Sequence, residues 1–201
     1  MVTEALLFAL SVVLGYLLGS VPTGYLVARV RGIDIQRVGS GNIGATNVLR
    51  AVGALPALMV AVFDPLKGAL AVLLAMLLGL SEWGMALAGL AAVLGNNFNI
   101  FLRLRGGKGI ATSIGVFLVI APVAALAATG IGIFAIAIGR YVSLGSLVGM
   151  FSAPLLLVMG HWSPSSLFLA TALFFLAMLR HRDNLGRLSL GTERRLGMRR
   201  Q

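Results

Sequence analysis

The sequence predicts an all-α protein, a polytopic transmembrane helical bundle with seven spans, on two observations. Of the 201 residues, 59% are hydrophobic and only 11% are charged, and the mean hydropathy is +0.99. A soluble domain carries about 25% charged residues, and this chain has too few to cover its surface in water. The charges are also unevenly spaced, so that long uncharged runs alternate with short charged stretches, and about 20 apolar residues cross the hydrocarbon of a bilayer.

Five apolar stretches define the predicted spans in chain order. The first is an uncharged run of 24 residues, 5–28, which is too long for a removable signal peptide and lacks its basic start. The second is 51–80, which two charged residues interrupt, and the third is 83–102. Two longer uncharged runs follow, with 31 residues at 109–139 and 39 residues at 141–179.

Each of the two long runs is expected to cross twice. The later one turns at residues 161–164, whose His-Trp-Ser-Pro sequence favours a turn. The earlier one is expected to turn near Thr129 and Gly130, because two passes place 15 of the 16 Lys and Arg residues on one side. This topology puts the N-terminus outside and the C-terminus in the cytoplasm. The passes of 109–139 reach only about 22 Å each, so we expect them to be short, tilted or partly re-entrant; five or six spans stay possible.

Composition also narrows the function classes. The chain has no cysteine, two histidines and six carboxylates, so Cys-ligated metals are excluded and neither a metal nor a cofactor is expected. The net charge of +10 fits basic residues gathered at membrane edges, where they attract anionic headgroups and anionic substrates. We therefore expect contact with membrane lipid and no nucleic acid. Residues 1–201 are expected to form a single integral-membrane domain that acts as a monomer.

The first polar motif runs over residues 39–47 and is followed by Arg50. Its glycines allow positive φ, and turns of this kind can form a nest of N–H groups that binds anions. Arg50 adds a charged fork suited to phosphate. A flexible loop with an Asn N-cap is the alternative. The candidate residues here are Ser40, Gly41, Asn42, Gly44, Thr46, Asn47 and Arg50.

The second motif is Gly106-Gly107-Lys108-Gly109, which leads into a predicted helix. Glycines and a lysine before a helix N-terminus can form an anion site through backbone donors and the helix dipole. A nucleotide-binding P-loop is not expected, because Gly109 follows the lysine and no strand precedes the motif. The alternative is a tight cytoplasmic turn whose charges only set the topology.

The third motif lies in the basic C-terminal segment. His181 and Asn184 share a face if this segment is helical, and a neutral histidine beside an anionic site can act as a base or a donor. The alternative is a basic tail solvated among headgroups. His161 lies in the predicted outer turn, and we interpret it as interfacial. Asp64 and Lys67 stand three apart inside a span, where charges need partners. Their spacing permits a pair on one helical face. We expect structural pairing with another helix and no catalytic role, and the sequence leaves open whether the two residues pair with each other.

The three motifs together resemble the bacterial acyl-phosphate:glycerol-3-phosphate acyltransferase family of inner-membrane enzymes. The similar segments agree in order, spacing and length across nearly the whole chain. They are residues 40–50, 106–112 and the set His181, Asn184, Arg187, Leu188, Gly191, Thr192 and Glu193, with further likeness at 64–68 and 142–146.

The resemblance implies transfer of a fatty acyl group from acyl phosphate to the sn-1 hydroxyl of glycerol 3-phosphate, at the cytoplasmic face of the bacterial inner membrane. The products would be lysophosphatidic acid and inorganic phosphate, the first step of phospholipid synthesis. By the same resemblance, Lys108 pairs with the phosphate of glycerol 3-phosphate. Ser40 and Arg50 belong to the reaction centre, and Glu193 is structural. Ser143, His181 and Asn184 place the glycerol moiety.

The sequence also departs from the family and leaves alternatives. Asn96 and Asn99 stand where the family commonly has His and Pro. Neither histidine has the His-x-x-x-x-Asp spacing of acyltransferases that use thioester donors, because Ser166 and Gly186 occupy the Asp positions. A small membrane transporter of an organic phosphate, with broken helices around its anion site, is the main alternative. A non-catalytic lipid-binding subunit is another.

Overall fold

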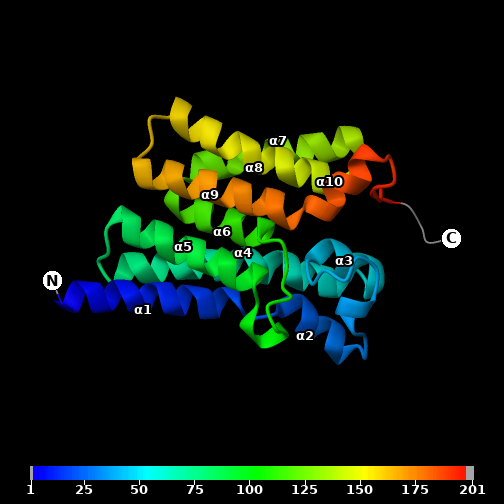
Figure 1. Cartoon of the computed structure of the whole chain (residues 1–201), viewed down its shortest axis with the longest axis horizontal. Helices are drawn as coiled ribbons and strands as arrows, with labels where there is room; N and C mark the ends of the chain where they lie inside the picture. The colour runs from blue at the N-terminus through cyan, green and yellow to red at the C-terminus, as the bar shows by residue number, and fades with distance from the viewer. Residues whose placement is uncertain (1, 198–201) are drawn as a thin grey trace. The chain divides into compact units, whose positions relative to one another are not determined.

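The computed structural model describes residues 2–197, and all regular structure in that range is helical. The chain divides after Ile120 into two compact units, which Figure 1 colours from blue to green and from green to red. The first unit contains α1 (Val2–Gly19), α2 (Thr23–Val30), η1 (Ile35–Arg37), α3 (Ala45–Ala51), α4 (Ala54–Leu77), α5 (Glu82–Asn97), η2 (Ile100–Leu102) and α6 (Ile110–Ile120). The second contains α7 (Pro122–Gly139), α8 (Val142–Met159), α9 (Pro164–Arg180) and α10 (Arg182–Ser189).

In the first unit, α4 and α5 pack against each other and against α1 and α6. Glycines allow these helices to approach closely. A Cβ added at Gly19 of α1 would collide with the carbonyl oxygen of Ala92 in α5, and one at Gly115 of α6 would collide with that of Pro65 in α4. Small residues at such contacts are typical of helices that associate in lipid.

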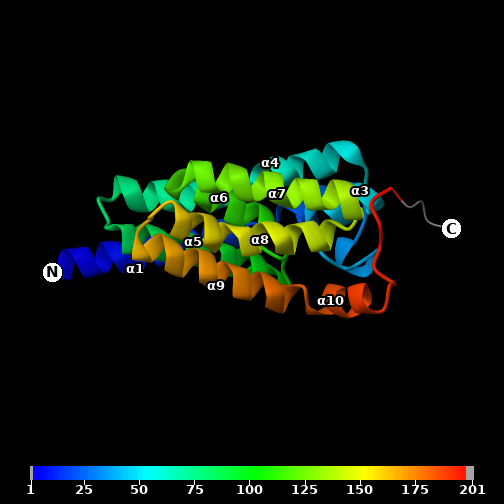
Figure 2. The same cartoon turned by 90° about the horizontal axis from the view of Figure 1, so that it is seen from above.

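In the second unit, α8 packs against α7 on one side and α9 on the other, and the three helices run alongside one another (Figure 2). Gly132 of α7 and Gly145 of α8 meet backbone to backbone, because a Cβ on Gly145 would collide with the Gly132 carbonyl oxygen. A bend of 62° separates α10 from α9, and this bend turns the basic C-terminal helix away from the apolar axis of α9.

The expected all-helical membrane fold is confirmed. Within residues 2–197, five helical segments are long and apolar enough to cross a bilayer, or six if α9 and α10 count as one bent span. The five are Val2–Val30, Ala54–Leu77, Glu82–Leu102, Pro122–Gly139 and Val142–Met159. Large apolar side chains on these helices are exposed, as lipid-facing residues are. α6 has only 11 residues, which rise about 16 Å, so seven full spans stay a prediction.

One predicted turn is wrong and one is confirmed. Helix α7 continues through Thr129 and Gly130, and the chain breaks instead at Ala121, directly before Pro122. Proline fits the first turn of a helix because its missing N–H would have no partner there, whereas a lone glycine is tolerated within a membrane helix. The turn at residues 161–164 lies between the end of α8 at Met159 and the start of α9 at Pro164.

Candidate active site

The amide of Asn47 organises the first polar loop, residues 39–47, in the first unit. Its Oδ1 accepts from the N–H of Ser40 (3.1 Å), and its Nδ2 donates to the carbonyl oxygens of Val38 (3.0 Å) and Asn42 (2.9 Å). Asn47 is itself only 3% exposed. One buried side chain thus joins both ends of the loop to the first turn of α3, which gives the loop a fixed shape.

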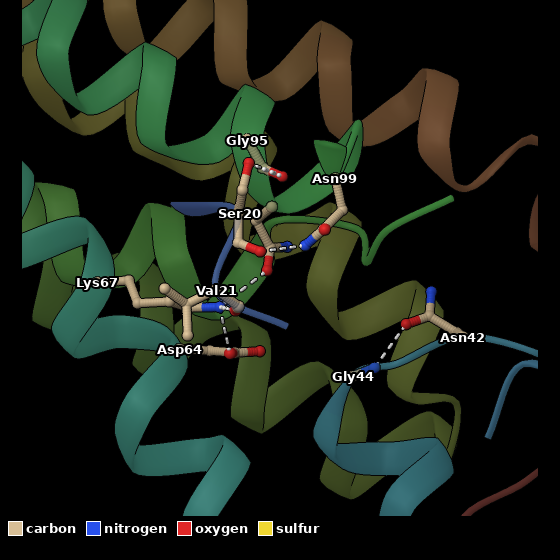
Figure 3. A network of polar contacts seen from close by, with 9 residues as sticks. Ser20, Val21, Asn42, Gly44, Asp64, Lys67, Gly95 and Asn99 are labelled. Carbon is tan, nitrogen blue, oxygen red and sulfur yellow. Dashed lines mark hydrogen bonds and ion pairs between the residues drawn. The ribbon is translucent and has the colours of Figure 1, made fainter. Parts of the chain in front are cut away.

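Local turn chemistry completes this loop. Asn42 Oδ1 accepts from the N–H of Gly44 at 2.7 Å (Figure 3), an Asx turn directly before α3. Gly41 has a φ of +69°, where glycine is favoured. The N-cap of α3 is Gly44, so the Asn N-cap of the alternative interpretation, a flexible loop, is absent from this helix. Ser40 and Arg50 are both exposed at the two ends of the motif, where they can meet a solute.

The Gly-Gly-Lys-Gly turn is attached to the C-terminal end of α5. The N–H groups of Gly106 and Gly107 donate to the carbonyl oxygens of Asn97 (3.2 Å) and Asn96 (2.8 Å). A Cβ on Gly106 would collide with the Asn96 carbonyl oxygen, which explains why glycine stands there. These two backbone donors bind protein carbonyls, so the anion-binding role expected of the turn rests on Lys108 and Gly109.

One hydrogen bond joins the chain just before the first loop to the chain just before the Gly-Gly-Lys-Gly turn. Gln36, in η1, donates from Nε2 to the carbonyl oxygen of Arg105 at 2.9 Å. Arg105 directly precedes Gly106, so this bond joins the stretches of chain that lead into the two polar motifs, although 69 residues separate the bonded pair. The sequence analysis missed Gln36, because no local pattern marks a contact of this range.

A buried polar network lies beside these segments in the first unit. Lys67 Nζ lies 2.8 Å from Asp64 Oδ1, so the two charges pair with each other within α4, which the sequence had left open. Lys67 also donates to the carbonyl oxygen of Val21 (2.8 Å) and to Asn96 Oδ1 (3.4 Å). Asn99 donates to the carbonyl oxygen of Ser20 at 2.6 Å. The two asparagines that depart from the family pattern are therefore both part of this network, in which Figure 3 labels Asn99, Ser20, Val21, Asp64 and Lys67.

In the second unit, Glu193 accepts hydrogen bonds from three residues, two of them in the third motif. Its Oε1 accepts from Ser143 Oγ (2.9 Å) and Asn184 Nδ2 (2.6 Å), and its Oε2 accepts from Arg187 Nε (2.8 Å). Burial raises the pKa of this carboxyl, but the hydrogen bonds from Asn184, Arg187 and Ser143 and the charge of Arg187 outweigh burial and hold the pKa below its usual value. Glu193 thus stays an anion, and it orients the side chains of Ser143, Asn184 and Arg187.

His181 lies at the bend between α9 and α10 and is 2% exposed. Its Nδ1 is 2.8 Å from the carbonyl oxygen of Ala177. A carbonyl only accepts, so Nδ1 donates, and in the neutral ring Nε2 then carries the lone pair. That tautomer is the one a base acting through Nε2 requires.

In the first unit, glycine-rich turns with basic residues lie at the ends of apolar helices, an arrangement typical of an integral membrane protein that binds anions. Residues 9–191 match the family model described as glycerol-3-phosphate acyltransferase. A glycerol-3-phosphate acyltransferase of Thermus thermophilus is 53% identical over 192 residues, which cover 94% of this chain and 95% of that protein.

Two solved structures are also similar, both of PlsY (YgiH), an integral membrane glycerol 3-phosphate acyltransferase, at 38% identity. The glycerol 3-phosphate form has a TM-score of 0.91 and covers 94% of this chain and 96% of its own. The lysophosphatidic acid form has a TM-score of 0.89, with 94% and 95% covered. The chain belongs to the glycerol-3-phosphate acyltransferase family. It is a membrane acyltransferase, and the transporter and subunit alternatives find no support.

Proposed function

We propose that this acyltransferase uses acyl phosphate as its donor and acylates the sn-1 hydroxyl of glycerol 3-phosphate, giving lysophosphatidic acid and inorganic phosphate. Both substrates carry a phosphate, so the reaction needs two neighbouring anion sites. The hydrogen bond from Gln36 to Arg105, which joins the stretches of chain that lead into the two polar motifs of the first unit, is the observation that carries this proposal. The glycerol 3-phosphate and lysophosphatidic acid forms of PlsY agree with the acceptor and the product.

Roles for the first unit follow from charge and exposure. Lys108 binds the phosphate of glycerol 3-phosphate, with Gly106, Gly107 and Gly109 shaping the turn around it. Arg50 and Ser40, exposed at the ends of the first loop, stabilise the phosphate of the donor. The loop residues Gly41, Asn42, Gly44, Thr46 and Asn47 hold this site in shape.

Roles for the second unit rest on Glu193 and His181. Glu193 fixes the Ser143 hydroxyl and the Asn184 amide, which bind the glycerol hydroxyls. The sn-1 oxygen attacks the acyl carbonyl carbon directly, and the carbon–oxygen bond to phosphate breaks. The proton of the hydroxyl passes to the departing phosphate or to His181 Nε2. Acyl phosphate is already activated, so proximity and charge stabilisation supply the rate without an acyl-enzyme.

The setting of the reaction is also a proposal. We place seven helical passes in the bacterial inner membrane, with α6 short or partly re-entrant, the N-terminus outside and the C-terminus and reacting groups on the cytoplasmic side. This arrangement gathers the basic loops on one face, as membrane topology favours. Residues 1–201 work as one acyltransferase domain in a monomer.

The test uses purified protein in lipid with glycerol 3-phosphate and either palmitoyl phosphate or palmitoyl-CoA. We expect product from palmitoyl phosphate alone, acylated at sn-1 as read by NMR of the isolated lipid. Rapid quench with labelled palmitoyl phosphate should leave no label on the protein. Turnover with the thioester, or an acylated Ser40, would overturn the donor or the direct route.

A further inference from the structure

Lys67 is a buried cation that contacts three helical elements at once. Its side chain is 8% exposed and that of its partner Asp64 is 10% exposed. The three acceptors are Asp64 Oδ1 in α4, the carbonyl oxygen of Val21 between α1 and α2, and Asn96 Oδ1 in α5. An ammonium has three donors, so each N–H has an acceptor on a different element.

The contact at Val21 supports the element that carries the first loop. The chain breaks between Gly19 and Thr23, where Pro22 has no N–H to offer a helix. Lys67 and Asn99 donate to the carbonyl oxygens of Val21 and Ser20 in this break. Helix α2 then packs against the first loop so closely that a Cβ on Gly24 would collide with the carbonyl oxygen of Ile43.

The contact at Asn96 supports the Gly-Gly-Lys-Gly turn. The backbone oxygen of Asn96 accepts from Gly107, and the amide nitrogen of its side chain lies against the Gly107 α-carbon, 2.8 Å from where a Cβ would stand. The hydrogen bond from Gln36 to Arg105 joins the stretches of chain that lead into the loop and into the turn. Lys67 therefore bonds to Val21, next to the helix that supports the first loop (Figure 3), and to Asn96, which supports the turn.

Stability alone does not account for charges in this place. A buried ion pair replaced by apolar residues of similar volume is often neutral or stabilising. The ammonium of Lys67 instead fixes the positions of three oxygens relative to one another, those of Asp64, Val21 and Asn96.

We infer that Lys67 is a positioning residue for the two phosphate-binding segments, with Asp64 as its charge partner and Asn96 as its link to the Gly-Gly-Lys-Gly turn; this rests on the proposed function. The inference explains how asparagine replaces the histidine that is common at position 96. Its amide oxygen accepts from Lys67 as a neutral imidazole nitrogen would.

The test compares four variants in lipid. Asn96→Leu removes the acceptor and keeps the branched shape of the side chain, with the same number of heavy atoms, and Asn96→His restores an acceptor. The double variant Asp64→Asn with Lys67→Met removes both charges without leaving either unpaired. Ser11→Ala is the matched control, because Ser11 is a buried serine in α1 that bonds only within its own helix, to the Phe8 carbonyl oxygen. Thermal unfolding and kinetic constants per folded protein are measured for each.

Asn96→Leu and the double variant should raise the KM for glycerol 3-phosphate by about tenfold or more, the scale seen when a group that orients a site is lost. Asn96→His should bring KM back toward the wild-type value, and Ser11→Ala should leave it there. Unchanged KM in both altered proteins, whatever their melting temperatures, would overturn the positioning role alone. No turnover by wild-type protein would overturn the proposed function as well.

Discussion

Replacement of Glu193 by glutamine tests whether one carboxylate holds the third motif together. The change keeps the shape of the side chain and removes its charge. Glu193 is 7% exposed and accepts three hydrogen bonds, two on Oε1 and one on Oε2. In the glutamine, an oxygen can still accept from Ser143 and Asn184, but the amide nitrogen faces the Nε donor of Arg187.

The loss can be estimated from these contacts. Hydrogen bonds to a charged group contribute about 1.5–3 kcal/mol and neutral ones about 1 kcal/mol. The Arg187 side chain is 40% exposed, so solvent screens its share. Together we expect the folded state to lose about 2–4 kcal/mol, which lowers Tm by roughly 5–15 °C in a chain of this size.

The assay is thermal unfolding in lipid or detergent, with Asp183→Asn as the matched control. Asp183 lies in α10 next to Asn184, is 78% exposed and has a long contact to Arg182 at 3.6 Å, so its amide variant should differ from wild type by less than about 1 kcal/mol. Equal Tm for the two variants would refute the view that Glu193 organises the motif.

Three further results are expected. The pKa of Glu193 lies below its usual 4.5, so the stability it contributes is full above that value and is lost as pH falls through the lower folded pKa. The Tm gap between wild type and Glu193→Gln should therefore shrink on acidification below about pH 4.5; a widening gap would contradict this. Lys108→Ala should lower kcat/KM for glycerol 3-phosphate by about 30-fold or more, the equivalent of about 2 kcal/mol, whereas the exposed Arg182→Ala should leave it near wild type. Gly106→Ala should disrupt the turn through its collision with Asn96, and Gly186→Ala, where a Cβ meets open space, should stabilise α10 by about 0.5–1 kcal/mol; equal activity in both would contradict the packing argument.

The membrane class and the polar loops could be predicted from the sequence, because charge and apolar runs report directly on the surrounding solvent. The break at Ala121 could not be placed, since the run 109–139 carries no charge to divide it. Pro122 and Gly130 were competing local signals for a turn. Helix packing decides between two such residues, and packing depends on partners distant in the chain.

The candidate site divides in the same way. The glycine loop followed from its composition, but the hub role of Asn47 depends on acceptors that the loop presents only when folded. Asp64 and Lys67 were predicted to be structural, but their spacing did not decide whether they pair with each other, and the contacts of Lys67 with Val21 and Asn96 span 46 and 29 residues. Glu193 and Ser143 are 50 residues apart. Local patterns identified the polar residues, but their hydrogen-bond partners depend on the tertiary fold.

The central claim is that acyl phosphate is the donor and that Lys108 binds the acceptor. The most direct measurement follows inorganic phosphate and lysophosphatidic acid together, from palmitoyl phosphate and glycerol 3-phosphate, with wild-type protein and the folded Lys108→Ala variant. We predict that wild-type protein releases the two products in equal amounts and that the variant releases little of either. Phosphate released without lipid, or equal turnover by the variant, would contradict the account.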